Sequence, residues 1–444
     1  MRLALTAAPF HSDPRRLRHL DNTANLGLYL LAAVAGEAGH EVAVVDPSRN
    51  PSRMTPVEFA VAFSGFDVVG LSATTSTWPE TRLLLERLDR ELPARPILVL
   101  GGPHATIFDE RALVTTPLDY VARGEGERTL VDLLAALAGG RDPAGIPGLS
   151  CLRDGELARG PDRPPLTEAE LAALPLPRYD LVPPGYYQAL PLETSRGCWH
   201  RCAFCSITSH RNWRDLGADR LGRALAAAQG EIGKYTRGAV HLIDDCFLAR
   251  GRRLEPLARA LAQSDLPLAL STRVSDLRRP EALEFYSRLP VSVCELGVEC
   301  GYDEGMKLVG KGITTADVSD LAAVLKARGL ADRILYAYIV GLPWEGLNEC
   351  LATVKFAFGL ARAHGGRIQL GWFLLYPGSE IFREQERFGL AVGPEVYDLP
   401  HFWRDPDLFS SMHPRLDREG EHKVSYSARF LARMHPEIKT FLMV

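Results

Sequence analysis

Short apolar runs and amphipathic stretches alternate along the first 140 residues of the chain. The apolar runs predict strands at Arg2–Ala7, Glu41–Asp46, Asp67–Ala73, Pro96–Gly102 and Tyr120–Gly124. The amphipathic stretches predict helices at Leu26–Glu37, Pro79–Leu92 and Glu125–Leu137. This alternation is typical of an α/β domain with a flavodoxin-like, doubly wound parallel sheet. A ligand site is then expected at the carboxyl ends of its strands.

Residues 141–188 break this rhythm because they are rich in proline and glycine. They predict an extended linker with one small hairpin over Leu149–Leu157. The alternation returns over residues 189–390, with strands predicted at Leu190–Ser195, Val240–Asp244, Leu268–Arg273, Ser292–Glu299, Ile334–Gly341 and Ile368–Tyr376. Helices are predicted at Arg220–Lys234, Leu254–Gln263, Pro280–Leu289, Thr315–Ala327, Leu347–Ala363 and Ser379–Phe388. These units predict a partial (β/α)6 barrel with its chemistry at the carboxyl ends of the strands.

The last segment, residues 391–444, has a helical pattern over Val424–Met434 and contains Trp403, Phe409 and His413. We expect this short helical C-terminal extension either to close the open side of the barrel or to contact substrate. The pattern does not decide between these two roles.

Composition excludes some classes of partner. The chain has 444 residues, of which 46% are hydrophobic and 24% are charged, as in ordinary globular proteins. A formal net charge of −4 and scattered basic residues do not favour a nucleic-acid partner. No apolar run has membrane-spanning length, and the first residues lack the pattern of a signal peptide. Eight cysteines in so long a chain do not indicate a disulfide framework, so we expect a reducing, cytoplasmic location.

Three cysteines, Cys198, Cys202 and Cys205, lie in the run Thr-Ser-Arg-Gly-Cys-Trp-His-Arg-Cys-Ala-Phe-Cys. Three thiolates on one short loop can hold three irons of a 4Fe–4S cluster and leave the fourth iron open for a small ligand. A structural zinc site built from this run alone lacks its fourth protein ligand. The run therefore favours an iron–sulfur cluster over a zinc loop.

The C-x3-C-x2-C spacing, with aromatic Phe204 before the last cysteine, resembles the signature of the radical S-adenosylmethionine (SAM) superfamily. The resemblance implies that the open iron chelates the amino and carboxylate groups of SAM. It also implies that one electron, from an external reductant such as flavodoxin or ferredoxin, cleaves SAM to a 5'-deoxyadenosyl radical.

Besides Phe204, which is a candidate for SAM binding, four residues at predicted strand ends are candidate SAM ligands: Asp244, Arg273, Glu299 and Gly341. A carboxylate such as Glu299 can accept hydrogen bonds from ribose hydroxyls, and the Arg273 guanidinium can pair with the SAM carboxylate. Gly341 allows a backbone to approach flat adenine. The surrounding runs resemble the ribose motif and the adenine-contacting motif of the superfamily, at Leu296–Gly301 with Lys311-Gly312 and at Tyr338–Pro343.

In the first domain, Ser72 and Thr74 end one predicted strand and Gly101 and Gly102 end the next. These residues resemble the S-x-L…G-G portion of cobalamin-binding domains, which lines the slot for the nucleotide tail, and the stretch Asp119–Glu127 resembles the same domain in radical SAM proteins. The D-x-H-x-x-G element has no counterpart, so the resemblance implies cobalamin without an axial histidine. The alternative is a sheet that has lost its ligand and keeps only turn residues.

The sequence therefore predicts a cobalamin-dependent radical SAM methyltransferase. Its expected substrate is an unactivated carbon or a phosphinate of a small molecule, a natural product or a peptide, and no motif specifies which. Ring formation also occurs within this resemblance. A second alternative is an epimerase without cobalamin, in which Cys246, beside Asp244 and Asp245, donates a hydrogen atom; the other interpretation of Cys246 is a packing thiol. A non-enzymatic carrier has no need of a SAM-binding barrel.

Overall fold

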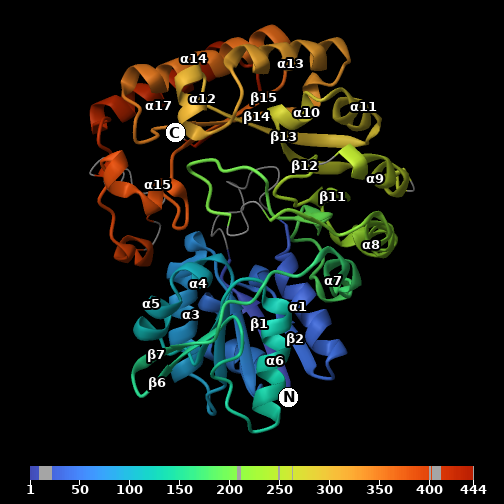
Figure 1. Cartoon of the computed structure of the whole chain (residues 1–444), viewed down its shortest axis with the longest axis vertical. Coiled ribbons are helices and arrows are strands. Elements are labelled where there is room, and N and C mark those ends of the chain that lie inside the picture. Colours follow the sequence, from blue (N-terminus) through green and yellow to red (C-terminus); the bar gives the residue numbers. More distant parts are fainter. Residues whose placement is uncertain are drawn as a thin grey trace. The chain divides into compact units, whose positions relative to one another are not determined.

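The chain folds into two compact units in a computed structural model that describes residues 1–9, 23–207, 212–248, 251–262, 264–399, 402 and 412–443 (Figure 1). The N-terminal unit comprises Met1–Leu190, Ala228–Arg237 and Pro394–Phe402. The C-terminal unit comprises Pro191–Ala227, Gly238–Gly393 and Trp403–Val444.

The N-terminal unit is built on a sheet of strand order β2-β1-β3-β4-β5-β6-β7. Its strands are β1 (Arg2–Ala7), β2 (Glu41–Val45), β3 (Val68–Ser72), β4 (Ile97–Gly101), β5 (Tyr120–Ala122), β6 (Leu149–Arg153) and β7 (Glu156–Arg159). Strands β1 to β5 pair in parallel in the 2-1-3-4-5 order of flavodoxin-like sheets, which confirms the predicted fold class. The predicted hairpin is present as β6 and β7, and it extends the sheet by antiparallel pairing to β5.

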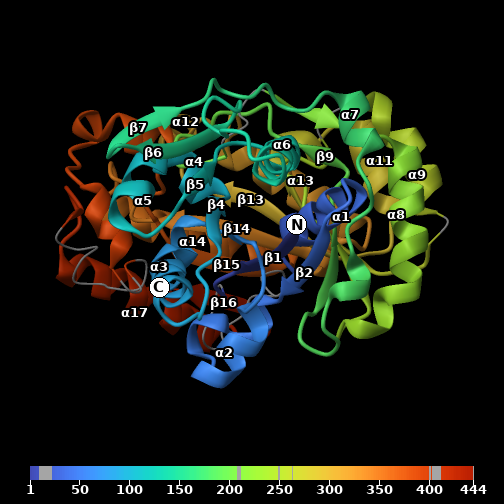
Figure 2. The ribbon, with the colours of Figure 1, turned by 90° about the horizontal axis from the view of Figure 1, so that it is seen from below.

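Helices cover both faces of this sheet: α1 (Leu26–Glu37), α2 (Pro56–Phe63), α3 (Trp78–Arg90), α4 (Pro103–Ile107), α5 (Asp109–Thr115), α6 (Gly126–Ala138) and α7 (Glu168–Ala173). Alternation along β1 explains the two cores, because Leu3 and Leu5 pack with α1 and α6 while Ala4 packs with α2 and α3 (Figure 2). The helices α2, α4 and α5 and, within the predicted extended linker, α7 were not predicted, because each is shorter than the window needed to recognise a helical period.

The C-terminal unit contains a second sheet of order β16-β15-β14-β13-β12-β11-β8, with parallel pairing from β11 to β16. Its strands are β8 (Ala189–Leu192), β11 (Ala239–Leu242), β12 (Leu268–Arg273), β13 (Val291–Glu299), β14 (Ile334–Val340), β15 (Arg367–Trp372) and β16 (Thr440–Met443). The seventh strand, β16, was not predicted. The first predicted strand is divided into β8 and β9 (Ser195–Arg196), because the Thr194 amide donates to Asp244, and β9 pairs with β10 (Arg214–Asp215).

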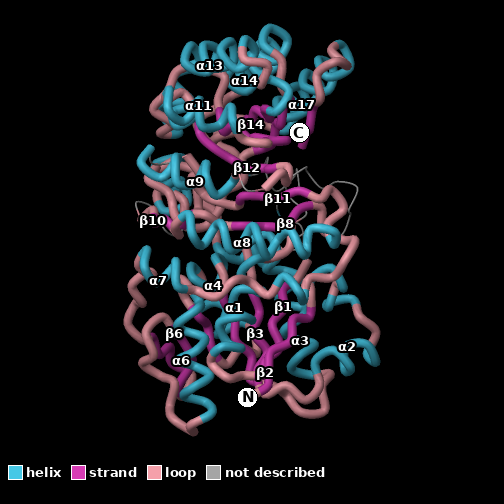
Figure 3. Tube along the Cα trace, turned by 90° about the vertical axis from the view of Figure 1, so that its right-hand side faces the viewer, coloured by secondary structure: helices cyan, strands magenta, loops and turns pink. Residues whose placement is uncertain are grey.

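Helices of this unit are α8 (Ala218–Glu231), α9 (Leu254–Leu261), α10 (Val274–Leu277), α11 (Pro280–Arg288), α12 (Asp303–Val309), α13 (Thr315–Ala327), α14 (Leu347–His364), α15 (Glu380–Arg383) and α17 (Arg418–Met434). Helix α14 packs on β14, β15, α13 and α17, and Figure 3 shows α13 and α14 side by side beyond β14. With its helices between successive strands, the unit has the partial-barrel architecture that the sequence predicts.

Strand register brings the candidate ligands to one edge of this sheet. Arg273 of β12 is paired with Gly297 of β13. The β13–β14 register shifts between Gly297 and Glu299, which marks a bulge at the end of β13. Arg273 and Glu299 therefore end neighbouring strands at the edge where a barrel carries its chemistry.

Candidate active site

The loop that carries the three cysteines starts directly after β9 and is fixed at three points. Gly197 turns the chain at a φ of +84°, and its amide donates to the Asp245 carboxylate at 3.1 Å. Further along, the amide of Ala203 donates to the carbonyl of Val309 at 2.9 Å. The carbonyl of Ala203 accepts from the amide of Ile381 at 3.1 Å. The loop is thus held by segments that follow β11, β13 and β15.

Asp244, a predicted SAM ligand, is buried at the base of this loop. Its carboxylate accepts the Thr194 hydroxyl at 2.6 Å, the Thr194 amide at 3.1 Å and the Ser195 hydroxyl. Burial raises the pKa of this carboxyl above its ordinary value, and the positive charge of Arg253 acts against that rise. These contacts fix β8 and β9 below the cysteines, whereas a role of Asp244 toward SAM stays a prediction.

The three cysteines differ in their surroundings. The Arg273 guanidinium donates to the Cys202 sulfur at 2.7 Å. Burial raises the pKa of Cys205 to about 12, with further contributions from the neighbouring sulfurs of Cys202 and Cys198. The Cys246 thiol lowers the pKa of Cys198 through a hydrogen bond.

This donor set fits a 4Fe–4S cluster. A guanidinium directed at a sulfur matches a ligand that carries negative charge, and sulfurs close enough to influence one another match ligands of a shared inorganic group. Phe204 is half-buried between Ala203 and Cys205 on the same loop.

Glu299 and Arg273, the two charged SAM-ligand candidates, lie within one network. The Glu299 carboxylate forms an ion pair of 2.7 Å with Lys311, and Arg273 donates through its second terminal nitrogen to the Lys311 carbonyl at 2.9 Å. The buried Nε of Arg273 has no hydrogen-bond partner within the described part of the chain. A buried carboxylate and a guanidinium with a spare donor fit the amino-acid and ribose groups of SAM.

Gly341, the candidate for adenine contact, begins a tight turn after β14 at a φ of +78°. The fully buried Glu345 carboxylate accepts the amides of Gly341 at 2.7 Å and Leu342 at 3.0 Å, and the Tyr302 hydroxyl at 3.0 Å. Burial raises the pKa of Glu345 to about 7. The buried Glu345 carboxylate therefore fixes the conformation of this turn.

Cys246, the candidate hydrogen-atom donor, is 1% exposed and packs with Cys198 and Trp213. Its sulfur lies 3.3 Å from the Asp276 carboxylate, which is a second acceptor for the single thiol proton besides Cys198, and His200 lies 3.6 Å from the same carboxylate. The ligand atoms of His200, Cys246 and Asp276 lie within 4.8 Å of one another, as the donors of a metal ion would. Since His200 belongs to the cysteine loop, this group is part of the same site.

The cobalamin candidates lie at the ends of β3 and β4 in the N-terminal unit. Gly102 has a φ of +94°, and a Cβ atom there would lie 2.7 Å from the Ala73 carbonyl oxygen, so the close approach of the segment after β3 requires glycine at this position. A Cβ atom at Gly101 would meet only ordinary contacts of 3.7 Å or more. Ser72 is half-buried and Thr74 is exposed, and the Thr74 hydroxyl lies 3.2 Å from that of Thr77. Small hydroxylated residues at these strand ends fit a ligand that extends along them.

A cluster near this edge was not predicted from the sequence. Asp398 accepts from the indole of Trp78 at 2.7 Å and pairs with Arg82 and Arg111. Trp78 stacks on His104, which follows Gly102 closely, and burial lowers the pKa of His104 to about 3, so its ring is neutral. Arg111 and Asp398 are 287 residues apart, and no short-range pattern reports such a contact.

His413 belongs to the C-terminal unit and contacts the turn after β14 through Gly341 and Leu342. Trp403 and Phe409, the other two side chains noted in the extension, lie outside the described residues.

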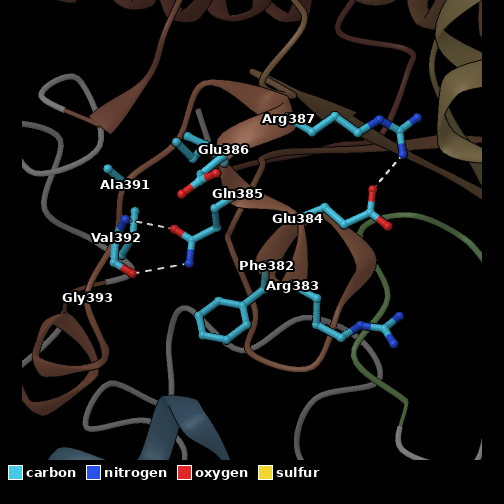
Figure 4. A pocket seen from close by; sticks show the side chains of 10 residues that line it. Phe382, Arg383, Glu384, Gln385, Glu386, Arg387, Ala391, Val392 and Gly393 are labelled. Carbon is cyan, nitrogen blue, oxygen red and sulfur yellow. Dashed lines mark hydrogen bonds and ion pairs between the residues drawn. The ribbon is translucent and has the colours of Figure 1, made fainter.

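A surface hollow of about 650 Å³ lies beside residues 382–393 (Figure 4). In its lining, the Gln385 side chain forms hydrogen bonds with the backbone amide and carbonyl of Val392, and Arg387 pairs with Glu384. Its polar groups largely satisfy one another, so it adds no chemistry to the site.

Comparison with known families covers both units. Residues 20–134 match the B12 binding domain, and residues 192–357 match the radical SAM superfamily. An uncharacterized methyltransferase, PH0819, of Pyrococcus horikoshii is 30% identical over 345 residues, which are 75% of this chain and 72% of that protein. The chain belongs to the radical SAM enzymes that carry a B12 binding domain.

Other relatives are more distant. An anaerobic magnesium-protoporphyrin IX monomethyl ester cyclase of Rubrivivax gelatinosus is 24% identical, over 84% of this chain and 67% of that protein. Cytidylyl-2-hydroxyethylphosphonate methyltransferase of Streptomyces wedmorensis is 25% identical, over 89% of this chain and 85% of that protein. The solved structure of OxsB, a cobalamin-dependent radical SAM enzyme, superposes with a TM-score of 0.69 at 17% identity, covering 98% of this chain and 67% of that one, and it shares the fold.

Family membership confirms the predicted superfamily, the fold class and the predicted cofactors. A radical SAM domain implies a 4Fe–4S cluster and SAM, and a B12 binding domain implies cobalamin. The individual roles of Cys198, Cys202 and Cys205 and of the SAM and cobalamin residues remain predictions, which the geometry above makes more specific. Two contacts that sequence analysis did not predict, the ion pair of Lys311 with Glu299 and the hydrogen bond of the Gly341 amide to Glu345, become visible only in the structure.

Proposed function

We propose that this enzyme is a cobalamin-dependent methyltransferase that methylates an unactivated carbon or a phosphinate of a small molecule, natural product or peptide. The observation that carries the proposal is the contact of Arg273 with Cys202, next to the buried Glu299 on the neighbouring strand end. This arrangement supports a site in which SAM is held against a cysteine-bound cluster. When bound, the cluster and SAM supply a carbon-centred radical, and cobalamin supplies a methyl group.

The residues of this chain bind and orient the reactants. Cys198, Cys202 and Cys205 would ligate three irons of the cluster. Arg273 would pair with the SAM carboxylate while it donates to the Cys202 sulfur, and Glu299 would accept hydrogen bonds from the ribose. The rigid turn at Gly341 would present flat backbone to adenine, which keeps the reacting carbon in one place.

Similarity to two methyltransferases supports methyl transfer as the outcome. The phosphonate methyltransferase supports a small-molecule substrate in particular, because it matches over most of both chains. The magnesium-protoporphyrin cyclase favours ring formation as a second candidate function.

The epimerase alternative requires Cys246 to reach a substrate radical. Its thiol is 1% exposed, shares its hydrogen bonding with Asp276 and lies against Cys198. These contacts support a role of Cys246 beside the cluster ligand rather than as a hydrogen-atom donor.

A reducing location and an external electron donor belong to the same proposal. The eight cysteines all lie in the described residues, and none of them forms a disulfide. We therefore propose a cytoplasmic enzyme reduced by a flavodoxin or ferredoxin. In the described part of the chain, no helix combines the length and the apolar character needed to cross a membrane.

The decisive experiment uses anaerobically reconstituted protein. Visible spectra before and after addition of hydroxocobalamin should show binding of one cluster and one corrinoid. With SAM and a reductant, methyl transfer should yield S-adenosylhomocysteine in a cobalamin-dependent manner, together with 5'-deoxyadenosine. Formation of 5'-deoxyadenosine alone, with no S-adenosylhomocysteine at any cobalamin concentration, would reject methyl transfer and favour cyclisation or epimerisation.

A further inference from the structure

Lys311 is buried at the centre of the candidate SAM site although it lies outside every strand. Its side chain is 5% exposed, and its ammonium lies 2.7 Å from the Glu299 carboxylate and 3.1 Å from the Gly297 carbonyl oxygen. Because a lysine is seldom buried unless it is paired, these two contacts account for its position.

The partner of Lys311, Glu299, has an unusual backbone conformation. Its φ is +73°, a left-handed conformation that is uncommon for a residue with a side chain, and it follows the register shift that ends β13. A Cβ atom at Gly297 would lie 2.6 Å from the Glu299 carboxylate and 2.9 Å from the Lys311 ammonium, so glycine leaves the space for this pair. The Glu299 carboxylate thus lies at a bulged strand end, where the Lys311 ammonium is its ion-pair partner.

The backbone around Lys311 fixes the other two parts of the site. The Lys311 carbonyl accepts from the Arg273 guanidinium at 2.9 Å, and the same guanidinium donates to Cys202. Two residues earlier, the Val309 carbonyl accepts from Ala203 of the cysteine loop at 2.9 Å. One short segment therefore contacts the carboxylate, the guanidinium and the cluster loop.

We propose that Lys311 is the positioning residue of the SAM pocket: its ammonium sets the Glu299 carboxylate, while its carbonyl sets the Arg273 guanidinium against the cysteine loop. This inference rests on the proposed function, because it assumes that Glu299 and Arg273 contact SAM. Lys311 acts through Glu299 and does not itself touch the cofactor. The opposite possibility is that the Lys311 ammonium competes with the cationic groups of SAM for the same carboxylate.

The two possibilities predict opposite effects of Lys311→Met, which keeps an unbranched side chain that is one heavy atom shorter and removes its charge. If Lys311 positions Glu299, SAM affinity should fall roughly tenfold to hundredfold, as expected for loss of one hydrogen bond to a charged group. Iron content and the visible spectrum of the cluster should stay unchanged. Equilibrium dialysis of SAM against reconstituted protein measures the effect without requiring turnover.

A double-mutant cycle keeps the test valid if Lys311→Met folds poorly. The double variant Glu299→Gln/Lys311→Met no longer buries an unpaired carboxylate and should be easier to fold. If Lys311 acts through Glu299, this variant should bind SAM within about twofold of Glu299→Gln alone. Lys307→Met is the matched control, because Lys307 lies on α12 with a side chain that is 79% exposed, and its SAM affinity should equal that of the wild type.

Each other outcome is informative. Unchanged or tighter SAM binding by Lys311→Met, or a double variant much weaker than Glu299→Gln, would overturn the positioning role. Wild-type protein that holds a cluster but binds no SAM would instead overturn the proposed function and leave this inference without its premise.

Discussion

His413 and Glu345 bond opposite sides of the same turn. Nε2 of His413 lies 3.1 Å and 3.2 Å from the carbonyl oxygens of Gly341 and Leu342, whose amides donate to Glu345. Nδ1 of His413 accepts from the amide of Leu416, so the ring proton is on Nε2 and the imidazole is neutral. Burial accordingly lowers the pKa of His413. A residue of the C-terminal extension therefore fixes the turn that we propose to lie against adenine.

The stability of the C-terminal unit should fall as the pH rises through neutrality because of Glu345. Burial raises the pKa of this carboxyl from 4.5 to about 7. A folded-state pKa above the unfolded one gives stability that is complete below about pH 4.5 and is lost as the pH rises through about 7. The shift corresponds to about 3 kcal/mol in the free energy of unfolding.

Thermal unfolding of the wild type and of Glu345→Gln at pH 5 and pH 8 measures this contribution. The wild type should lose stability relative to the variant at pH 8, since glutamine does not ionise. Glu304→Gln is the control, because that carboxylate is 64% exposed and should leave the pH dependence unchanged. An identical pH dependence of wild type and Glu345→Gln would show that Glu345 does not titrate in this range.

Replacement of Cys198, Cys202 or Cys205 by alanine should remove the cluster and reductive SAM cleavage. Each variant removes one of the three thiolates that would hold iron, and no fourth cysteine follows on this loop. Iron content and 5'-deoxyadenosine formation are the measurements. Cys151→Ala is the control, because Cys151 is a buried thiol in β6 of the N-terminal unit and should keep both. SAM cleavage by a triple alanine variant would contradict the assignment.

Glu299 and Arg273 should have separable effects. Glu299→Ala should weaken SAM binding roughly tenfold to hundredfold and leave the cluster unchanged. Arg273→Gln should weaken SAM binding and also lower the reduction potential of the cluster, because a cationic donor to the Cys202 sulfur stabilises the more negative, reduced state. Potentiometry with spectroscopic detection measures that second effect. An unchanged potential would mean that Arg273 leaves the sulfur once the cluster is bound.

Sequence patterns predicted the elements of this protein better than its contacts. Leu26–Glu37, Leu268–Arg273 and Thr315–Ala327 were each predicted with the bounds that the structure has, because their apolar periods are long and end at clear signals. β16 was missed, since Thr440–Met443 is too short to show alternation and lies far in sequence from its partner β15.

At the candidate site too, individual residues could be predicted from the sequence, but their contacts could not. Motif spacing singled out the cysteine loop, and predicted strand ends singled out Arg273 and Glu299 as candidates. It could not show that Asp244 is bonded to Thr194, that Lys311 pairs with Glu299, or that His413 reaches Gly341, 72 residues away. Those facts depend on which strand ends become neighbours, and local patterns do not encode that pairing.

The cobalamin site can be tested at Ser72 with less disturbance than at Gly102. A side chain at Gly102 would strain a backbone at φ +94° and strike the Ala73 carbonyl oxygen, so loss of cobalamin there would have two explanations. Ser72→Trp places the added ring at the half-buried end of β3 and should block corrinoid uptake. Val114→Trp, at a 63% exposed position of α5, is the control and should bind hydroxocobalamin like the wild type.

The spectrum of bound corrinoid after gel filtration measures this uptake. Cluster content and 5'-deoxyadenosine formation should survive in Ser72→Trp, because these properties belong to a unit with its own core. Full corrinoid uptake by the tryptophan variant would place the tail slot elsewhere in the domain.

The last prediction separates methyl transfer from epimerisation at Cys246. Cys246→Ser keeps a hydroxyl that can donate to Asp276, but a hydroxyl is a far poorer hydrogen-atom donor than a thiol. If the buried thiol only supports Cys198, this variant should retain its iron, SAM cleavage and cobalamin-dependent S-adenosylhomocysteine formation. Iron content is measured first, because Cys246 packs directly on Cys198.

An epimerase would differ in its cobalamin dependence, in the source of the hydrogen in its product and in the effect of Cys246→Ser. Wild-type protein would convert substrate without cobalamin and incorporate solvent-derived hydrogen into the product. Cys246→Ser would then keep its cluster and still form 5'-deoxyadenosine, yet stop product formation. Asp276→Asn tests the same point from the other partner, since it preserves the thiol and changes only its acceptor. If Asp276→Asn remains active while Cys246→Ser does not, the thiol itself is the hydrogen-atom donor. That result would reject the methyltransferase proposal in favour of the epimerase.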